Sequence, residues 1–292
     1  MTKPYFLLLC LATACGSREP PSSKADVPPP PGDATTTNDD ESTTPDPDPA
    51  QCGTLKWIRT VEAASFETPF KPRFLGATAV AGATPDKTNL ALGHGTNEGC
   101  GRDMMKPTSL DIYDDNGALL ETRQLSSERC SLGLGHDGTR FLTLSRASST
   151  GGLEIVSLDD DSRVVDLGAA TAQALAIRDG RAWLRNWDGY VSFAFPAGGD
   201  RSLIPHVRVG SRASGPTIGL ASGDFGLWGA REAFEGGMTN FLFVLRPPST
   251  ECAFPVEKFP GMQGTKIWGM AARGNQVFVL AGNSLVVFEH DG

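Results

Sequence analysis

Short apolar runs separated by turn residues fill most of the chain after residue 52. These runs alternate with Gly, Asp and Asn, and almost none of them has the periodicity of an amphipathic helix. Runs of this length that are bounded by turn residues are typical of β-strands. The pattern therefore predicts an all-β domain over residues 52–292.

A strand–turn–strand unit recurs along this domain. Four copies align on a turn glycine, and successive glycines lie 42, 43 and 51 residues apart: Gly138, Gly180, Gly223 and Gly274. A looser copy, with its turn at residues 85–86, precedes them. Each of the five units continues into a third strand, and the first four units also continue into a fourth. The expected fourth strands cover residues 120–125, 163–168, 206–210 and 254–259.

The fifth unit ends at Gly292 after only three strands, whereas an unassigned strand at residues 55–63 precedes the first unit. Units of this length with four strands each have the spacing of propeller blades. Residues 52–292 thus resemble β-propellers in general rather than one named family. We expect about five four-stranded blades, with the N-terminal strand completing the last blade and so removing its open edge. A pair of β-sandwiches or a distorted barrel is the alternative.

The first residues have the pattern of a secretion signal. Lys3 precedes an apolar run at residues 5–11, and the small residues 12–14 stand directly before Cys15. This run is shorter than the roughly 20 residues that a transmembrane helix needs, so we expect the signal to be removed.

A signal that ends directly on a cysteine resembles the signal of bacterial lipoproteins. The match departs from that family at Ala12, where Leu is usual. The resemblance implies that residues 1–14 are cleaved off and that Cys15 receives the lipid that anchors the protein to a membrane of the cell envelope. Because Gly16 rather than Asp follows the cysteine, the resemblance favours the outer membrane.

The segment 15–51 has a different composition from the rest of the chain. It is rich in Pro, Ser, Thr and Asp, and residues 16–51 carry eight acidic and two basic side chains. Such a segment cannot bury enough apolar surface to offset its ordering entropy. We therefore expect a disordered, extended tether that carries most of the net charge of −8 of the chain.

Four of the six cysteines remain if one is lost with the signal and one carries lipid. An even number in an exported chain predicts two disulfides. In the propeller phasing, Cys100 and Cys130 share the face that holds the loops between second and third strands. Cys52 and Cys252 both precede fourth strands and share the opposite face. We predict the bridges Cys100–Cys130 and Cys52–Cys252.

The loops between second and third strands share one face, the loop face, with the connections between blades. The resemblance to propellers implies that a ligand binds there, and two of these loops are long, at residues 93–107 and 229–240. The candidate ligand-binding residues on this face are His94, Glu98, Arg102, Asp103, Trp187, Asp188, Arg231 and Glu232. The alternative is that these are solvated loop charges that pair with one another.

The sequence contains no recognisable catalytic or cofactor motif. A glycine-rich nucleotide loop, a P-loop, an HExxH zinc motif and a GxSxG nucleophile elbow are all missing from it. We therefore expect no catalytic residues, metal or cofactor, and the mildly acidic, exported domain argues against a nucleic-acid partner.

These features favour a non-catalytic envelope lipoprotein whose propeller binds or scaffolds an envelope protein or glycan. The alternative is an extracytoplasmic propeller enzyme, such as a glycan hydrolase or lyase.

Overall fold

The described residues of a computed structural model contain twenty β-strands, which are arranged as five separate sheets. The structure describes residues 52–62, 77–81, 88–96, 99–100, 104, 106–114, 116, 118–146, 151–168, 172, 174–185, 189–205, 217–233, 239–246, 250–282 and 284–292. The signal, Cys15 and the tether lie outside the described residues. Within the described part, no helix is both long and apolar enough to span a bilayer.

Each sheet is a blade of four antiparallel strands that follow one another in the chain. Blade 1 consists of β2 (Ala77–Ala81), β3 (Thr88–Thr96), β4 (Lys106–Asp114) and β5 (Leu119–Gln124). Blade 2 consists of β6 (Ser131–His136), β7 (Phe141–Arg146), β8 (Leu153–Ser157) and β9 (Arg163–Gly168). Blade 3 consists of β10 (Ala174–Arg178), β11 (Arg181–Arg185), β12 (Gly189–Ala194) and β13 (Ser202–Pro205).

The last two blades follow the same order. Blade 4 consists of β14 (Thr217–Gly223), β15 (Gly226–Ala233), β16 (Thr239–Arg246) and β17 (Thr250–Pro255). Blade 5 consists of β18 (Ile267–Arg273), β19 (Gln276–Ala281), β20 (Ser284–His290) and, as its outermost strand, β1 (Leu55–Glu62).

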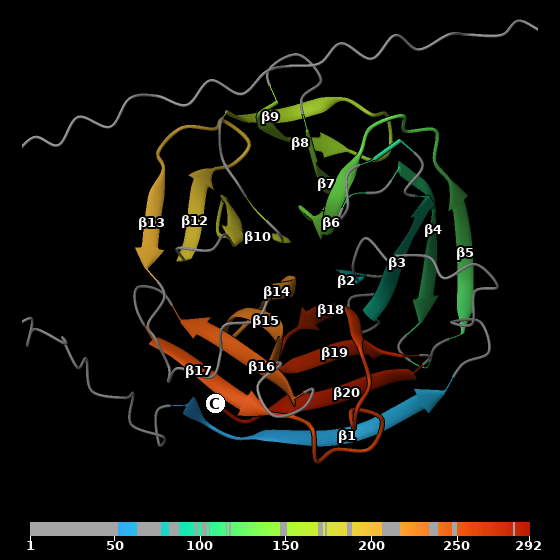
Figure 1. Cartoon of the computed structure of the whole chain (residues 1–292), viewed down its shortest axis with the longest axis vertical. Coiled ribbons are helices and arrows are strands. Elements are labelled where there is room, and N and C mark those ends of the chain that lie inside the picture. The colour runs from blue at the N-terminus through green and yellow to red at the C-terminus, as the bar shows by residue number, and fades with distance from the viewer. Residues whose placement is uncertain are drawn as a thin grey trace, which may run out of the picture. The chain divides into compact units, whose positions relative to one another are not determined.

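The first strands of the five blades form a closed inner ring. β2 contacts β6, β6 contacts β10, β10 contacts β14, β14 contacts β18, and β18 returns to β2. The blades radiate from this ring like the blades of a propeller (Figure 1). The five-bladed β-propeller expected from the repeat is therefore confirmed.

The inner strands are rich in Gly and Ala because neighbouring blades meet closely there. A Cβ atom at Gly219 of β14 would lie 2.9 Å from Cγ of Met270 in β18. A Cβ atom at Gly135 of β6 would lie 3.2 Å from Cδ2 of Leu175 in β10. Larger side chains at these two positions would force the blades apart, so the small residues allow the ring to close.

The hydrophobic core lies in layers between adjacent blades. Leu144 of blade 2 and Leu184 of blade 3 belong to one buried cluster, whereas Trp228 of blade 4 and Phe288 of blade 5 belong to another. All four side chains are almost completely removed from solvent. Burial of this apolar area is the main force that holds the blades together.

The N-terminal strand closes the ring, as the sequence predicted. β1 pairs antiparallel with β20, from Leu55 opposite His290 to Glu62 opposite Ser284 (Figure 1). The Asp291 carboxylate accepts hydrogen bonds from the backbone N–H and the hydroxyl of Thr54 at 2.6 and 2.7 Å. The same carboxylate forms an ion pair with Lys56 at 2.9 Å.

Both predicted disulfides are present. Cys52–Cys252 spans 200 residues and joins the chain just before β1 to β17, the outer strand of blade 4. Cys100–Cys130 spans 30 residues and joins the β3–β4 loop to the segment that precedes β6. Their Cα–Cα distances are 5.6 and 5.5 Å, within the usual range for such bridges.

Two of the four expected fourth strands are wrong in position. The fourth strand of blade 3 is β13 at Ser202–Pro205, earlier than the expected residues 206–210, which lie outside the described residues. The fourth strand of blade 4 is β17, which ends at Pro255 rather than running to residue 259. Proline has no N–H to donate to a strand partner, so pairing stops there. Consequently Cys252 lies inside the fourth strand, not before it.

Candidate functional site

Five of the eight residues predicted to bind a ligand lie in parts of the chain that the structure does not describe. Glu98, Arg102, Asp103, Trp187 and Asp188 lie outside the described residues. The backbones of Arg231 and Glu232 are part of β15, where they pair with Phe241 and Asn240 of β16. The structure does not describe the side chains of these two residues. The remaining candidate, His94, is described in full.

His94 takes part in a polar network inside blade 1. Its side chain is largely buried, and its Nε2 atom lies 2.9 Å from Oδ2 of Asp111. The other carboxylate oxygen of Asp111 accepts a hydrogen bond of 2.7 Å from the Thr122 hydroxyl. Because these residues come from β3, β4 and β5, the network connects the three outer strands of the blade. This arrangement gives His94 a structural role.

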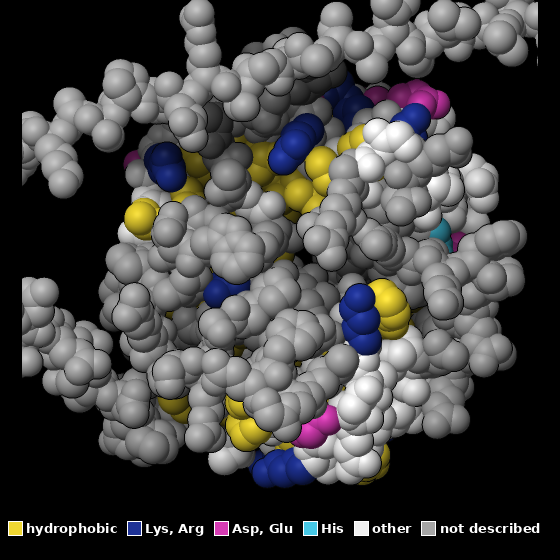
Figure 2. Space-filling model, viewed as in Figure 1, with side chains coloured by type: hydrophobic (Ala, Val, Ile, Leu, Met, Phe, Trp, Pro, Cys, Tyr) yellow, Lys and Arg dark blue, Asp and Glu magenta, His cyan; other side chains and the backbone are white. Residues whose placement is uncertain are grey.

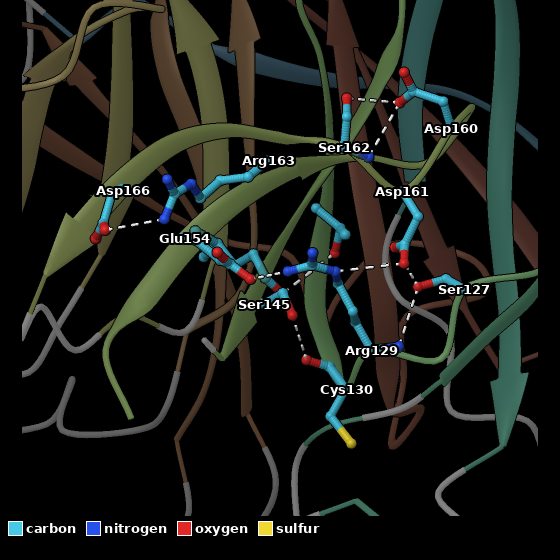
Figure 3. A network of polar contacts seen from close by, with 12 residues as sticks. Ser127, Arg129, Cys130, Ser145, Glu154, Asp160, Asp161, Ser162, Arg163 and Asp166 are labelled. Atoms are coloured by element: carbon cyan, nitrogen blue, oxygen red, sulfur yellow. Dashed lines mark hydrogen bonds and ion pairs between the residues drawn. The ribbon is translucent and has the colours of Figure 1, made fainter. Parts of the chain in front are cut away.

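A second polar network lies next to Cys130, one partner of the Cys100–Cys130 bridge (Figure 3). Arg129 donates to Glu154 of β8, which is buried, and its Nε atom lies 3.4 Å from Oδ2 of Asp161. The Ser127 hydroxyl donates to the other oxygen of Asp161 at 2.8 Å.

The next residue after Arg129 is also held to blade 2. The carbonyl oxygen of Cys130 accepts a 3.2 Å hydrogen bond from the Ser145 hydroxyl (Figure 3). This network contains one arginine and two carboxylates, and it fixes residues 127–130, to which the β3–β4 loop is joined by the Cys100–Cys130 bridge.

The described residues line a cavity at the end of the ring opposite the loop face. We call this end the turn face, because the turns between first and second strands form it. The cavity has a volume of about 710 Å³ and is lined by the last residues of β6, β10, β14 and β18 and by the turns that follow them. The four glycines on which the sequence repeat aligns all line this central cavity: Gly138, Gly180, Gly223 and Gly274.

The wall and the rim of the central cavity differ in polarity. Leu134, Leu175, Ile177 and Phe195, from blades 2 and 3, form an apolar wall, in which Ile177 and Phe195 are only partly buried. The rim carries polar and charged residues: His136, Asp137, Arg178, Asp179, Ser222, Asp224 and Arg273. The lining is thus predominantly polar, with an apolar wall on one side.

Hydrogen bonds across blade boundaries fix this rim. Arg178 of blade 3 donates to the carbonyl oxygens of Gly223, Asp224 and Gly226 in the turn of blade 4. The backbone N–H of Asp224 in turn donates to the carbonyl oxygen of Gly274 in blade 5 at 3.0 Å. The three turns therefore form one connected edge of the cavity.

The blade 2 part of the rim is also ordered by local bonds. His136 Nδ1 accepts a 2.9 Å hydrogen bond from the backbone N–H of Gly138, and burial lowers the pKa of His136, so its ring is neutral at physiological pH. Burial alone would raise the pKa of Asp137, but hydrogen bonds from Arg140 and Thr139 hold that pKa well below its usual range. Asp137 is consequently a charged and fully hydrogen-bonded turn residue.

The cavity could not be predicted from the sequence, because its rim residues are ordinary turn formers. Asp-Gly and similar pairs predict tight hairpin turns without regard to ligands. Only the ring arrangement, which the repeat predicted, brings the turns of separate blades to one place. Among the described residues, no group of three or more His, Cys, Asp or Glu side chains is placed to hold a metal ion.

One face of the ring is shown with its side chains in Figure 2. The described Lys and Arg side chains on this face are dispersed over several blades, and hydrophobic side chains reach the surface near β7 and β8.

Comparison with known proteins supports the fold alone. No protein-family model matches the chain, and no curated protein sequence matches it. Among solved structures, glutaminyl cyclase from Myxococcus xanthus is similar with a TM-score of 0.50 and 11% identity, over 80% of this chain and 94% of that one.

Two further solved structures are similar at lower scores. A chain of the nidogen/laminin complex has a TM-score of 0.45 and 13% identity, over 78% of this chain and 84% of that one. Virginiamycin B lyase from Staphylococcus aureus has a TM-score of 0.41 and 8% identity, over 76% of this chain and 83% of that one. At such low identities the likeness concerns the architecture alone.

Proposed function

We propose that this protein is a lipid-anchored component of the bacterial cell envelope whose propeller binds an envelope ligand without catalysis. The ligand is a protein or a glycan, and the anchor is a lipid on Cys15 in the outer membrane. The central cavity on the turn face, rather than the loop face expected from the sequence, is the binding site in this proposal.

The compartment follows from the disulfides and the signal together. Two disulfides suggest an extracytoplasmic environment, because thiols are kept reduced in the cytoplasm. The sequence around Cys15 is similar to lipoprotein signals, and the acidic tether that follows supplies the reach for a domain held at a membrane surface.

The observation that carries the binding proposal is the central cavity itself. Its volume of about 710 Å³ lies within the range of small-molecule sites, and it combines an apolar wall with a fixed polar rim. A cavity of this size accommodates one sugar residue, one end of a peptide or one long side chain of a partner. The rim is held by backbone hydrogen bonds between blades, so it is already ordered before a ligand arrives.

The anchor is tested by partition into detergent. Wild-type protein expressed in a bacterial host should incorporate labelled palmitate and enter the detergent phase of Triton X-114. The Cys15→Ser variant should stay in the aqueous phase, whereas the matched Cys10→Ser variant should behave like the wild type. Equal partition of Cys15→Ser and the wild type would refute the anchor.

The binding site is tested by filling the cavity. The purified protein is immobilised and exposed to solubilised envelope extract and to peptidoglycan fragments. The Ser222→Trp variant places an indole in the cavity and should lose the retained ligand. Ser126→Trp, at an exposed position between β5 and β6 that does not line the cavity, should keep it. Retention by Ser222→Trp, or chemical conversion of the retained ligand, would contradict the proposal.

A further inference from the structure

The charged side chains around the central cavity differ in how many hydrogen bonds and ion pairs they already form within the protein. The lining contains three aspartates and two arginines, and the ring of His136 is neutral, so the excess charge of the lining is negative. An excess of one negative charge is small by itself. Its meaning depends on which of these groups is still able to contact a ligand.

The two arginines are already occupied. Arg178 donates through Nη1 and Nη2 to three carbonyl oxygens of the next turn, and its Nε atom lies 3.0 Å from Oδ2 of Asp179. These contacts engage all three guanidinium nitrogens, so the side chain serves to hold the rim together. Arg273 also has an interaction partner. An anionic ligand would have to displace these contacts.

The three aspartates of the rim differ in whether their carboxylates already have partners within the protein. The Asp137 carboxylate accepts hydrogen bonds from the side chains of Arg140 and Thr139, and Asp179 is paired with Arg178. Within the part of the chain that the structure describes, no hydrogen bond or ion pair engages the Asp224 carboxylate. The structure thus leaves one carboxylate on the rim available to a ligand.

The backbone that carries the Asp224 side chain is nevertheless held in place on both sides of the residue. The N–H of Asp224 donates to Gly274 at 3.0 Å, and its carbonyl oxygen accepts from Arg178 at 3.3 Å. A side chain on so fixed a backbone loses little freedom when it binds, which increases the affinity of an ion pair. Ile177 and Phe195 of the neighbouring blade 3, which are only partly buried, offer an apolar surface to the same cavity.

We infer that the central cavity binds a primary ammonium group at the end of an aliphatic chain, with Asp224 as its ion-pair partner and the Ile177–Phe195 wall in contact with the carbon chain. A peptide N-terminus with an apolar first residue and the side chain of a diamino acid both have this chemistry. The inference rests on the proposed function, because it takes the cavity to be the binding site.

The test uses small probes of equal length and different charge. Binding of n-hexylammonium, hexan-1-ol and hexanoate to the purified full-length protein is measured by saturation-transfer NMR and calorimetry. We expect hexylammonium to bind about five- to tenfold more tightly than hexanol, as for a charge-assisted hydrogen bond at a partly exposed site. Hexanoate should bind more weakly than hexanol because of the excess negative charge.

A pair of variants separates Asp224 from the general charge of the protein. Asp224→Asn should remove the preference for hexylammonium and leave hexanol binding unchanged. Asp160→Asn, which removes a charge from an exposed turn of blade 2 outside the cavity, should leave the preference intact. Both variants should show the melting temperature of the wild type within one or two degrees, because neither side chain is buried.

The outcomes show separately whether the ligand class is wrong and whether the cavity is the wrong binding site. Equal binding of the three probes, no binding of hexylammonium, or an unchanged preference in Asp224→Asn would overturn the ammonium inference. If the envelope ligand is then still lost in Ser222→Trp, the cavity remains the binding site for a ligand of other chemistry. If Ser222→Trp retains the envelope ligand and also binds hexylammonium like the wild type, both proposals fail.

Discussion

The two disulfides should contribute unequally to stability, because they close loops of very different length. In the chain-entropy description, a bridge stabilises the protein by restricting the unfolded chain, and the effect grows with the logarithm of the loop. For a separation of 200 residues the effect is about 5.3 kcal/mol, and for 30 residues about 3.6 kcal/mol. The difference, about 1.7 kcal/mol, does not depend on the constant in that relation.

The perturbation is the replacement of each pair by alanine. We expect Cys52→Ala/Cys252→Ala to lower the free energy of unfolding by about 1.7 kcal/mol more than Cys100→Ala/Cys130→Ala. The side chain of Cys252 is almost fully buried, so lost packing adds to the larger effect. The native ring should persist in both variants because β1 keeps its pairing with β20.

Urea titration monitored by tryptophan fluorescence measures both free energies. A control without packing changes is the Cys100→Ala/Cys130→Ala variant with and without reductant, which breaks only the long-range bridge and keeps both sulfur atoms. Equal destabilisation by the two double variants, or a larger loss from the shorter loop, would refute the reasoning. It would mean that the unfolded chain is already constrained by residual structure.

Three further predictions concern single residues. Burial lowers the pKa of His290 below its ordinary value of 6.5, so the folded protein binds a proton at this residue less readily than the unfolded chain does. The urea midpoint should therefore fall as the pH drops from 8 to 5.5, and it should fall less steeply in His290→Gln. Gly180→Ala should cost about 1–2 kcal/mol in a urea titration, because φ is +67° there while no atom obstructs the new Cβ, and an unchanged midpoint would contradict this. Arg178→Ala should cost about 1–2 kcal/mol through its lost bonds to the blade 4 turn, and faster hydrogen exchange at Asp224 would locate the loss.

The repeat was sufficient to predict the architecture because its signal is local. A glycine such as Gly180 or Gly274 marks a hairpin by its positive φ, and the regular spacing then sets the number of blades. The disulfides followed because the ring fixes which loops share a face. The fourth strands of blades 3 and 4 were misplaced because an outer strand is half exposed and has a weak apolar pattern.

The site was harder to predict than the fold. The interpretation of His94 as a ligand-binding residue did not foresee its contact with Asp111, since a histidine in a loop-like stretch has no sequence signal for burial. The sequence around Asp224 predicts only a turn residue. Its position beside the turns of blades 3 and 5 is what makes it a candidate ligand-binding residue. A site that is formed by residues of separate blades cannot be predicted from any single stretch of the sequence.

The position of the Cys52–Cys252 bridge also determines how the protein bears mechanical load. A pull on the chain that precedes Cys52 reaches the bridge before it reaches β1. The force then passes through a covalent bond into β17 of blade 4, instead of unzipping the hydrogen bonds between β1 and β20 one by one. With the bridge reduced, the same pull would peel the closing strand from the ring, so the redox state of one disulfide decides whether tension opens the propeller.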